Sequence, residues 1–171
     1  MELDPQTLNR AKQQAYRFLA YRSQTSNELR VRLQRRGHMA AVVDEVLRQL
    51  ETEGYIDDRK FAFEWARYRL QGKPLGRRRL SWELQQRGVP VESVGEVLQE
   101  VYAEFNEITL AEQAARKRLG TGVIPCSAHE RHRLARYLVR LGFGADTIVA
   151  ALAVVFPSTA ALDVIDDVDP L

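Results

Sequence analysis

The residues with the most evident chemical potential are Cys126, His129 and His132, which stand three positions apart. Thiolate and imidazole groups are zinc ligands, and a cysteine beside a histidine can also act as a nucleophile with its base. A structural zinc site needs four ligands, and no fourth cysteine or histidine stands nearby. The chain also lacks the glycine-rich loops that hold phosphates. We therefore predict no metal, no cofactor and no catalytic residue.

A second group of residues suits binding and not catalysis. Residues 59–79 hold eight Lys or Arg and a single acid, Glu64. On a helical projection Arg78, Arg79 and Trp82 face away from the leucines at 80 and 84, which predicts an exposed basic patch that includes an aromatic ring. Such a patch suits phosphates or an acidic protein groove. The candidate partner-binding residues are Arg67, Arg69, Lys73, Arg77, Arg78, Arg79 and Trp82.

Two alternatives stay open for this basic segment. The arginines can form nothing more than a solvated helix face. Trp82 has an apolar counterpart in Val31 and can pack on the first helix of its own unit. The binding hypothesis would also fail if carboxylates of the same chain neutralised the arginines.

A repeated pattern must position this segment. Leu, Leu and Gly stand at 29, 33 and 37, again at 80, 84 and 88, and again at 134, 138 and 142. Leucines four apart share one face of a short helix, and the glycine suits its left-handed end. Apolar residues then resume at helical spacing, and a further amphipathic segment precedes each pair. In the middle copy that segment has its apolar face on Phe61, Trp65 and Tyr68.

The predicted fold is therefore all-α, with three tandem three-helix repeats stacked into an elongated, curved body. We place the repeats at residues 1–56, 57–105 and 106–156, with the middle one basic. Residues 157–171 hold four aspartates and no basic residue, and we expect them to form a mobile acidic tail.

Composition limits the class of protein. The 171 residues are 45% hydrophobic and 28% charged, with a formal net charge of +2, as in a globular domain. No run of 18 apolar residues occurs, and residues 1–22 are too polar for a secretory signal. A single cysteine excludes an internal disulfide and suits a reducing compartment. We expect a cytoplasmic protein with no membrane contact.

Two blocks of sequence resemble the RecX family of bacterial recombination regulators. The first runs Gly54-Tyr55-Ile56-Asp57-Asp58 and is followed by Phe61-Ala62. The second contains Gly76, then Arg79-Leu80, Glu83-Leu84 and Gly88-Val89 at fixed spacing. The chain departs from the family in Lys73-Pro74, where Lys-Gly is common, and in its acidic tail. The family-motif candidates are Gly54, Tyr55, Asp57, Asp58 and Phe61.

The resemblance implies a regulator without a catalytic site that binds the RecA recombinase filament on single-stranded DNA. Such proteins mostly inhibit filament extension, ATP hydrolysis and strand exchange in DNA repair, recombination and the SOS response. We expect a monomer, with single-stranded DNA as a candidate contact inside the filament. The alternative is a direct DNA-binding helical module, with the helix pair at residues 77–99, that needs no recombinase partner.

Overall fold

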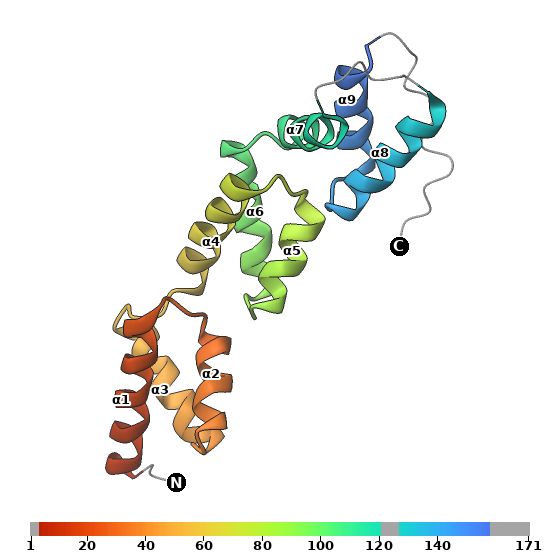
Figure 1. The fold of residues 1–171 in the computed structure, drawn as a ribbon. Helices are drawn as coiled ribbons and strands as arrows, with labels where there is room; N and C mark the ends of the chain where they lie inside the picture. Colours follow the sequence, from red (N-terminus) through yellow and green to blue (C-terminus); the bar gives the residue numbers. More distant parts are fainter. Residues whose placement is uncertain (1–3, 121–126, 158–171) are drawn as a thin grey trace. The chain divides into compact units, whose positions relative to one another are not determined.

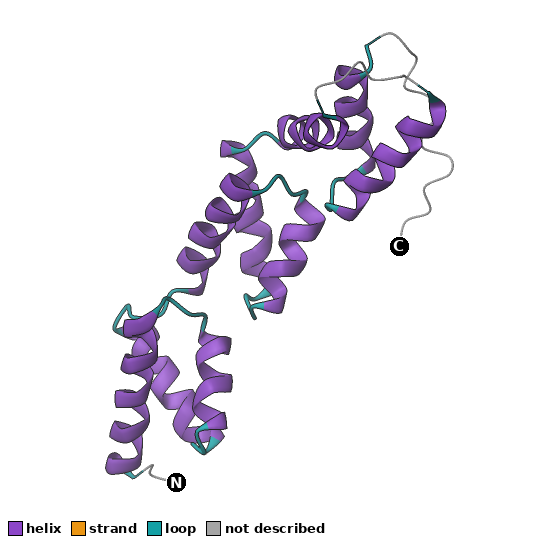
Figure 2. Cartoon of the chain, in the orientation of Figure 1, coloured by secondary structure: helices purple, strands orange, loops and turns teal. Residues whose placement is uncertain are grey.

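The computed structural model describes residues 4–120 and 127–157, and these ranges hold nine helices and no strand (Figure 1, Figure 2). The all-α class is thereby confirmed. No helix in the described ranges is long and apolar enough to cross a membrane. The helices are α1 (Pro5–Tyr21), α2 (Ser26–Arg35), α3 (Ala40–Thr52), α4 (Asp58–Gly72), α5 (Arg77–Gln86), α6 (Val91–Glu104), α7 (Glu107–Leu119), α8 (Ala128–Arg140) and α9 (Ala145–Val155).

Short-range side-chain chemistry sets where these helices begin and end. The Thr25 hydroxyl accepts a hydrogen bond from the backbone N–H of Glu28 at 3.1 Å, which caps α2. Ser127 caps α8 in the same way, at 3.2 Å from the N–H of Glu130. The repeated glycines at 37, 88 and 142 have φ of 86°, 79° and 87°, the left-handed region in which glycine is favoured. The predicted helix ends at these glycines are therefore confirmed.

The described residues fall into two compact units. The first comprises the described residues up to 65 together with 84–97, and the second comprises residues 66–83 together with the described residues from 98 to 157. In the first, α1, α2 and α3 pack on one another around a core that includes Leu29, Leu33 and Leu50. In the second, each of α7, α8 and α9 packs on the other two, as α1, α2 and α3 do in the first. The boundaries at 56, 105 and 156 stay a prediction, and residues 158–171, most of the proposed tail, lie outside the described ranges.

The first helix of each repeat buries a pair of alanines four residues apart. These pairs, at positions 11 and 15, 62 and 66, and 111 and 115, are all 0% exposed. Small side chains let neighbouring helices approach closely. The predicted core face of α4 is therefore displaced: Ala62, Ala66 and Leu70 are buried, Phe61 and Trp65 are half-buried, and Tyr68 is 75% exposed. The aromatics at 61, 65 and 68 share the helical spacing of a core stripe but are too large for this contact.

Candidate partner-binding surface

The predicted basic residues from 67 to 79 lie in the second unit, on the last turns of α4, in the following loop and at the start of α5. The start of α5 is fixed by neighbours distant in sequence. The N–H groups of Gly76 and Arg78 donate to the carbonyls of Leu141 and Gly142, at 2.9 and 3.1 Å. The N–H of Arg77 donates to the Glu107 carboxylate at 2.9 Å. The otherwise free N–H groups of a helix start are thus satisfied by α7 and by the turn after α8.

Arg77 links three helices. Its Nε donates to Glu107 Oε2 at 3.1 Å, and its guanidinium lies 4.6 Å from the ring centroid of Tyr102. Tyr102 is buried and donates its hydroxyl hydrogen to the carbonyl of Leu75 at 2.9 Å. Burial, together with the charge of Glu107, raises the pKa of Tyr102, so the phenol stays a neutral donor. Arg77 therefore has a structural role at the junction of α5, α6 and α7.

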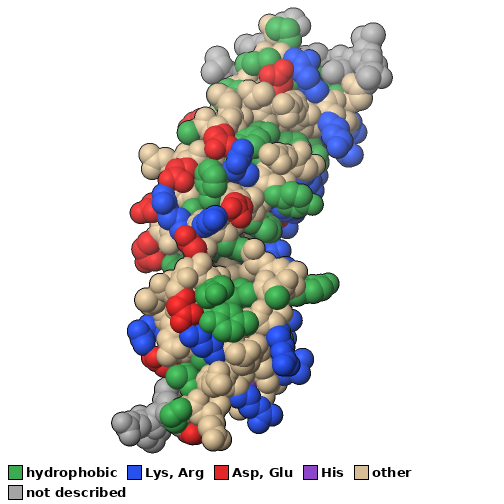
Figure 3. All heavy atoms as spheres, turned by 90° about the vertical axis from the view of Figure 1, so that its left-hand side faces the viewer, with side chains coloured by type: hydrophobic (Ala, Val, Ile, Leu, Met, Phe, Trp, Pro, Cys, Tyr) green, Lys and Arg blue, Asp and Glu red, His purple; other side chains and the backbone are tan. Residues whose placement is uncertain are grey.

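Glu83 holds two of the other candidate arginines. Its carboxylate accepts from Arg69 Nε and from Arg79 Nε, each at 2.9 Å. Partial burial acts to raise the pKa of Glu83, but the hydrogen bonds from Arg79 and Arg69 bring it below the ordinary value. Arg67 Nε lies 2.8 Å from Glu104 Oε2. Lys and Arg side chains accordingly lie beside Asp and Glu over the middle of the face in Figure 3.

These ion pairs correct the charge expected from sequence. Arg67, Arg69, Arg77 and Arg79 each meet a glutamate that lies outside residues 59–79, so the count of eight bases against one acid overstates the free positive charge. By contrast, no carboxylate of the described residues pairs with Arg78 or Lys73. The condition that would defeat the binding hypothesis is thus met for four of the candidate arginines but not for Arg78. Within the described ranges, the unneutralised charge of this surface is that of Arg78 and Lys73.

The Glu83 contact predicts a pH-dependent stability. Because the folded-state pKa of Glu83 lies below its unfolded value, its ionised form contributes stability at neutral pH that is lost as the pH falls through the folded pKa. We expect Glu83→Gln to lower the free energy of unfolding by about 1 kcal/mol near neutral pH and by less near pH 3. Urea unfolding at both pH values checks this, with exposed Glu51→Gln as the control. An equal loss at both pH values would contradict the assignment.

Trp82 is the aromatic member of this surface and is 50% exposed, so half of its surface is open to a partner. The Arg79 guanidinium lies 4.6 Å from its ring centroid, a cation–π contact one helical turn apart. On the α4 side a hollow is lined by Tyr68, Arg69, Gln71, Gly72 and Lys73. The surface thus combines exposed aromatic rings with two cations that have no carboxylate partner in the part of the chain that the structure describes.

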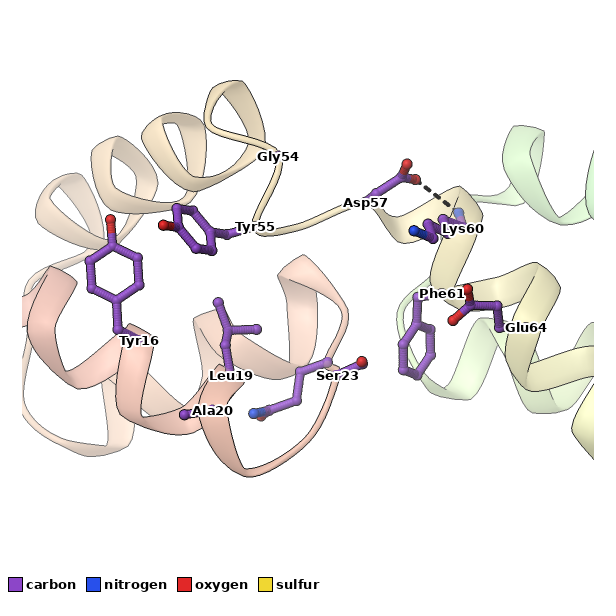
Figure 4. Close-up of a pocket in the computed structure, with 11 residues that line it drawn as sticks. Tyr16, Leu19, Ala20, Ser23, Gly54, Tyr55, Asp57, Lys60, Phe61 and Glu64 are labelled. Carbon is purple, nitrogen blue, oxygen red and sulfur yellow. Dashed lines mark hydrogen bonds between the residues drawn. The ribbon is translucent and has the colours of Figure 1, made fainter.

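The family-motif residues lie in the first unit, and all of them except Asp58 line a cleft of about 540 Å³ between α1, the α3–α4 link and α4 (Figure 4). Tyr55 follows Gly54, is 59% exposed, and meets Tyr16 edge-on with ring centroids 5.0 Å apart. Phe61 lies across the cleft from them, near the rim residues Lys60 and Glu64. Sequence reasoning named the motif but missed the part that α1 contributes, because the contribution of Tyr16 depends on tertiary packing.

The two acidic motif residues have local structural partners. Asp57 Oδ1 accepts from the N–H of Lys60 at 2.8 Å and so caps α4. Asp58 Oδ1 accepts from the N–H of Ser26 at 2.7 Å, which joins the start of α4 to the start of α2. Of the considered metal set, Cys126 lies outside the described residues, while His129 and His132 are on α8.

Tandem three-helix units that expose charged and aromatic side chains define a helical-repeat protein. In the described residues no group of three His, Cys, Asp or Glu is placed to hold a metal ion. Family models for "RecX, first three-helix domain" and "RecX, second three-helix domain" match residues 11–50 and 57–98. The chain belongs to the RecX family of regulatory proteins.

Individual relatives agree with this assignment. A "Regulatory protein RecX" of Halorhodospira halophila is 40% identical over 139 residues, which cover 81% of this chain and 84% of the relative. A protein of the same name from Pelodictyon phaeoclathratiforme is 30% identical over 138 residues, with the same two coverages. The crystal structure of RecX from Lactobacillus salivarius matches in fold with a TM-score of 0.78 at 17% identity, covering 86% of this chain and 95% of that one.

Proposed function

We propose that this chain binds the RecA recombinase as a filament on single-stranded DNA and mostly inhibits filament extension, ATP hydrolysis and strand exchange. It acts in the cytoplasm, in DNA repair and recombination, as a binding protein without a catalytic site. The observation that carries this proposal is membership of the RecX family over residues 11–98.

The surface on α4 and α5 is the proposed contact with the filament. Lys73 and Arg78 are the charges available to an acidic groove or a phosphate, and Trp82 is the kind of anchor that contributes most binding energy at interfaces. Arg79 and Arg77 have exposed side-chain fractions of 45% and 47%, so each can still use donors that its glutamate leaves free.

This protein inhibits ATP hydrolysis if the filament conformation that it binds most tightly differs from the conformation that hydrolyses ATP. A ligand shifts such an equilibrium only by its differential affinity for the two states. Repeats joined in one chain can contact neighbouring recombinase protomers, and contacts linked in this way strengthen one another through effective concentration. Weak single contacts then suffice to hold a filament in one state.

Co-sedimentation tests the proposal. We expect the protein to pellet with RecA filaments assembled on single-stranded DNA with a slowly hydrolysed ATP analogue, and to remain in the supernatant with RecA lacking DNA and nucleotide. Tight, sequence-selective binding to naked duplex DNA without any effect on the filament would favour the direct DNA-binding module instead. No pelleting and no effect on ATP hydrolysis would refute the proposal.

A further inference from the structure

A row of basic residues follows the exposed face of α8 in the third repeat. Arg133, Arg136 and Arg140 are all exposed and stand at steps of three and four, with His129 one turn before them. Residues at this spacing lie on one side of a helix. At a rise of about 1.5 Å per residue, successive arginines are about 4.5 to 6 Å apart along the helix axis. We call Arg133, Arg136 and Arg140 the α8 stripe.

The α8 stripe is free of the neutralisation seen on α4 and α5. In the described residues no carboxylate pairs with any of its three arginines. Glu130, three residues before the stripe, bonds Ser127 at the helix start, and Glu112 on the neighbouring α7 bonds Arg116 at 2.8 Å. Three unpaired guanidinium groups on one helix face concentrate positive potential there.

The stripe is a property of the third copy and not of the repeat. When the three copies are aligned on their repeat glycines, Gly37, Gly88 and Gly142, positions 133, 136 and 140 correspond to 28, 31 and 35 on α2. They correspond to 79, 82 and 86 on α5. Those positions hold Glu28, Val31 and Arg35 in the first copy, and Arg79, Trp82 and Gln86 in the second. The fold therefore does not require arginine at any of the three, and only the third copy places it at all of them.

Further arginines lie near the α8 stripe. The Arg118 guanidinium, at the end of α7, lies 5.6 Å from the ring centroid of Tyr137, which is half-buried between the stripe positions. At the other end of α8, the Gly142 carbonyl accepts from the N–H of Arg78 at 3.1 Å. The end of α8 accordingly lies beside the start of α5 (Figure 1). The stripe thus ends next to the unpaired Arg78 of the α4–α5 surface.

We propose that the α8 stripe binds the sugar–phosphate backbone of single-stranded DNA, with its arginines meeting successive phosphates. An evenly spaced row of one charge sign fits a chain with one negative charge at each nucleotide. An interface with protein would instead centre on a buried aromatic or apolar anchor, which the stripe positions do not supply. This site needs no recombinase, so its failure and that of the proposed function are separable.

Fluorescence anisotropy with a labelled oligothymidine tests the stripe in the absence of RecA. We expect Arg133→Ala, Arg136→Ala and Arg140→Ala together to raise Kd about tenfold. The slope of log K against log salt should fall by about 2, because each lost single-strand phosphate contact removes about 0.7. The control is Arg10→Ala, Arg17→Ala and Arg35→Ala together, which removes the same charge from exposed positions on α1 and α2. It should leave Kd within about twofold of the wild type.

Circular dichroism of both triple variants serves as the control for folding, and each should keep the helical spectrum of the wild type. Unchanged affinity and slope in the stripe variant, an equal loss in the control, or no binding by the wild-type chain would each overturn the proposal. Binding of duplex but not of the single strand would assign the stripe to duplex DNA and overturn it as well. Unaltered DNA affinity with lost inhibition of RecA would assign the stripe to a protein partner, again against the proposal.

Discussion

Replacing Lys73 and Arg78 together with glutamate is expected to raise about tenfold the concentration of this protein that half-inhibits ATP hydrolysis by RecA filaments. Tenfold corresponds to about 1.4 kcal/mol of binding free energy, which two reversed charges at an interface can supply. Both residues are exposed and neither pairs with a carboxylate of the described chain. The substitutions therefore change the surface potential without leaving an internal carboxylate unpaired. The measurement is the ATPase rate of RecA on single-stranded DNA against protein concentration.

Arg77 is unsuitable for this experiment although it belongs to the same basic segment. Glutamate at 77 would face Glu107 at the contact where Arg77 Nε now donates at 3.1 Å, and it would remove the guanidinium from the Tyr102 ring. Loss of inhibition would then reflect a broken junction between helices. Restricting the change to Lys73 and Arg78 separates binding from folding.

The matched control reverses Arg10 and Arg17, two exposed arginines on α1, by the same charge. It should shift half-inhibition by less than about twofold, because α1 belongs to the first unit and is not part of the proposed contact surface on α4 and α5. Trp82→Ala, which leaves charge unchanged, should also weaken inhibition, as loss of an aromatic anchor does. Undiminished inhibition by the Lys73/Arg78 variant would reduce this surface to a solvated helix face.

The helices could be predicted because their signals are local. Leucines four apart define a face, Thr25 and Ser127 start helices, and Gly37 ends one, all within a few residues of sequence. The α4 core face shows the limit of that reasoning. Phe61, Trp65 and Tyr68 share helical periodicity with a core stripe, but the face of α4 that is buried carries Ala62, Ala66 and Leu70.

The binding surface was predictable in position but not in charge. Arg69 finds Glu83 at a separation of 14 residues, and Arg77 finds Glu107 at a separation of 30. No local window of sequence contains both members of the second pair, so only tertiary packing shows that the charge is neutralised. The α8 stripe was overlooked for a different reason. Its arginines are about as dense as the basic residues of 59–79, but only the exposure of α8 in the fold shows that three of them share one open face.

Substituting two of the repeat glycines by alanine is expected to lower the free energy of unfolding by very different amounts, although the two positions share a backbone conformation. Gly37 and Gly142 have φ of 86° and 87°, so alanine meets the same left-handed strain at each. Their surroundings differ. A Cβ on Gly37 would meet nothing within 4 Å, whereas one on Gly142 would lie 2.3 Å from the backbone nitrogen of Arg79. Backbone cannot rotate away as a flexible side chain can.

We expect Gly37→Ala to lower the free energy of unfolding by about 1 kcal/mol, the strain alone, and Gly142→Ala to lower it by about 3 kcal/mol or more. The excess at 142 measures the close approach between the α8–α9 turn and the start of α5, where Gly142 also accepts from Arg78. Urea unfolding followed by circular dichroism gives both values. Equal losses would mean that α5 does not rest on this turn in solution, and the positions of Arg78 and Arg79 beside α8 would have to be abandoned.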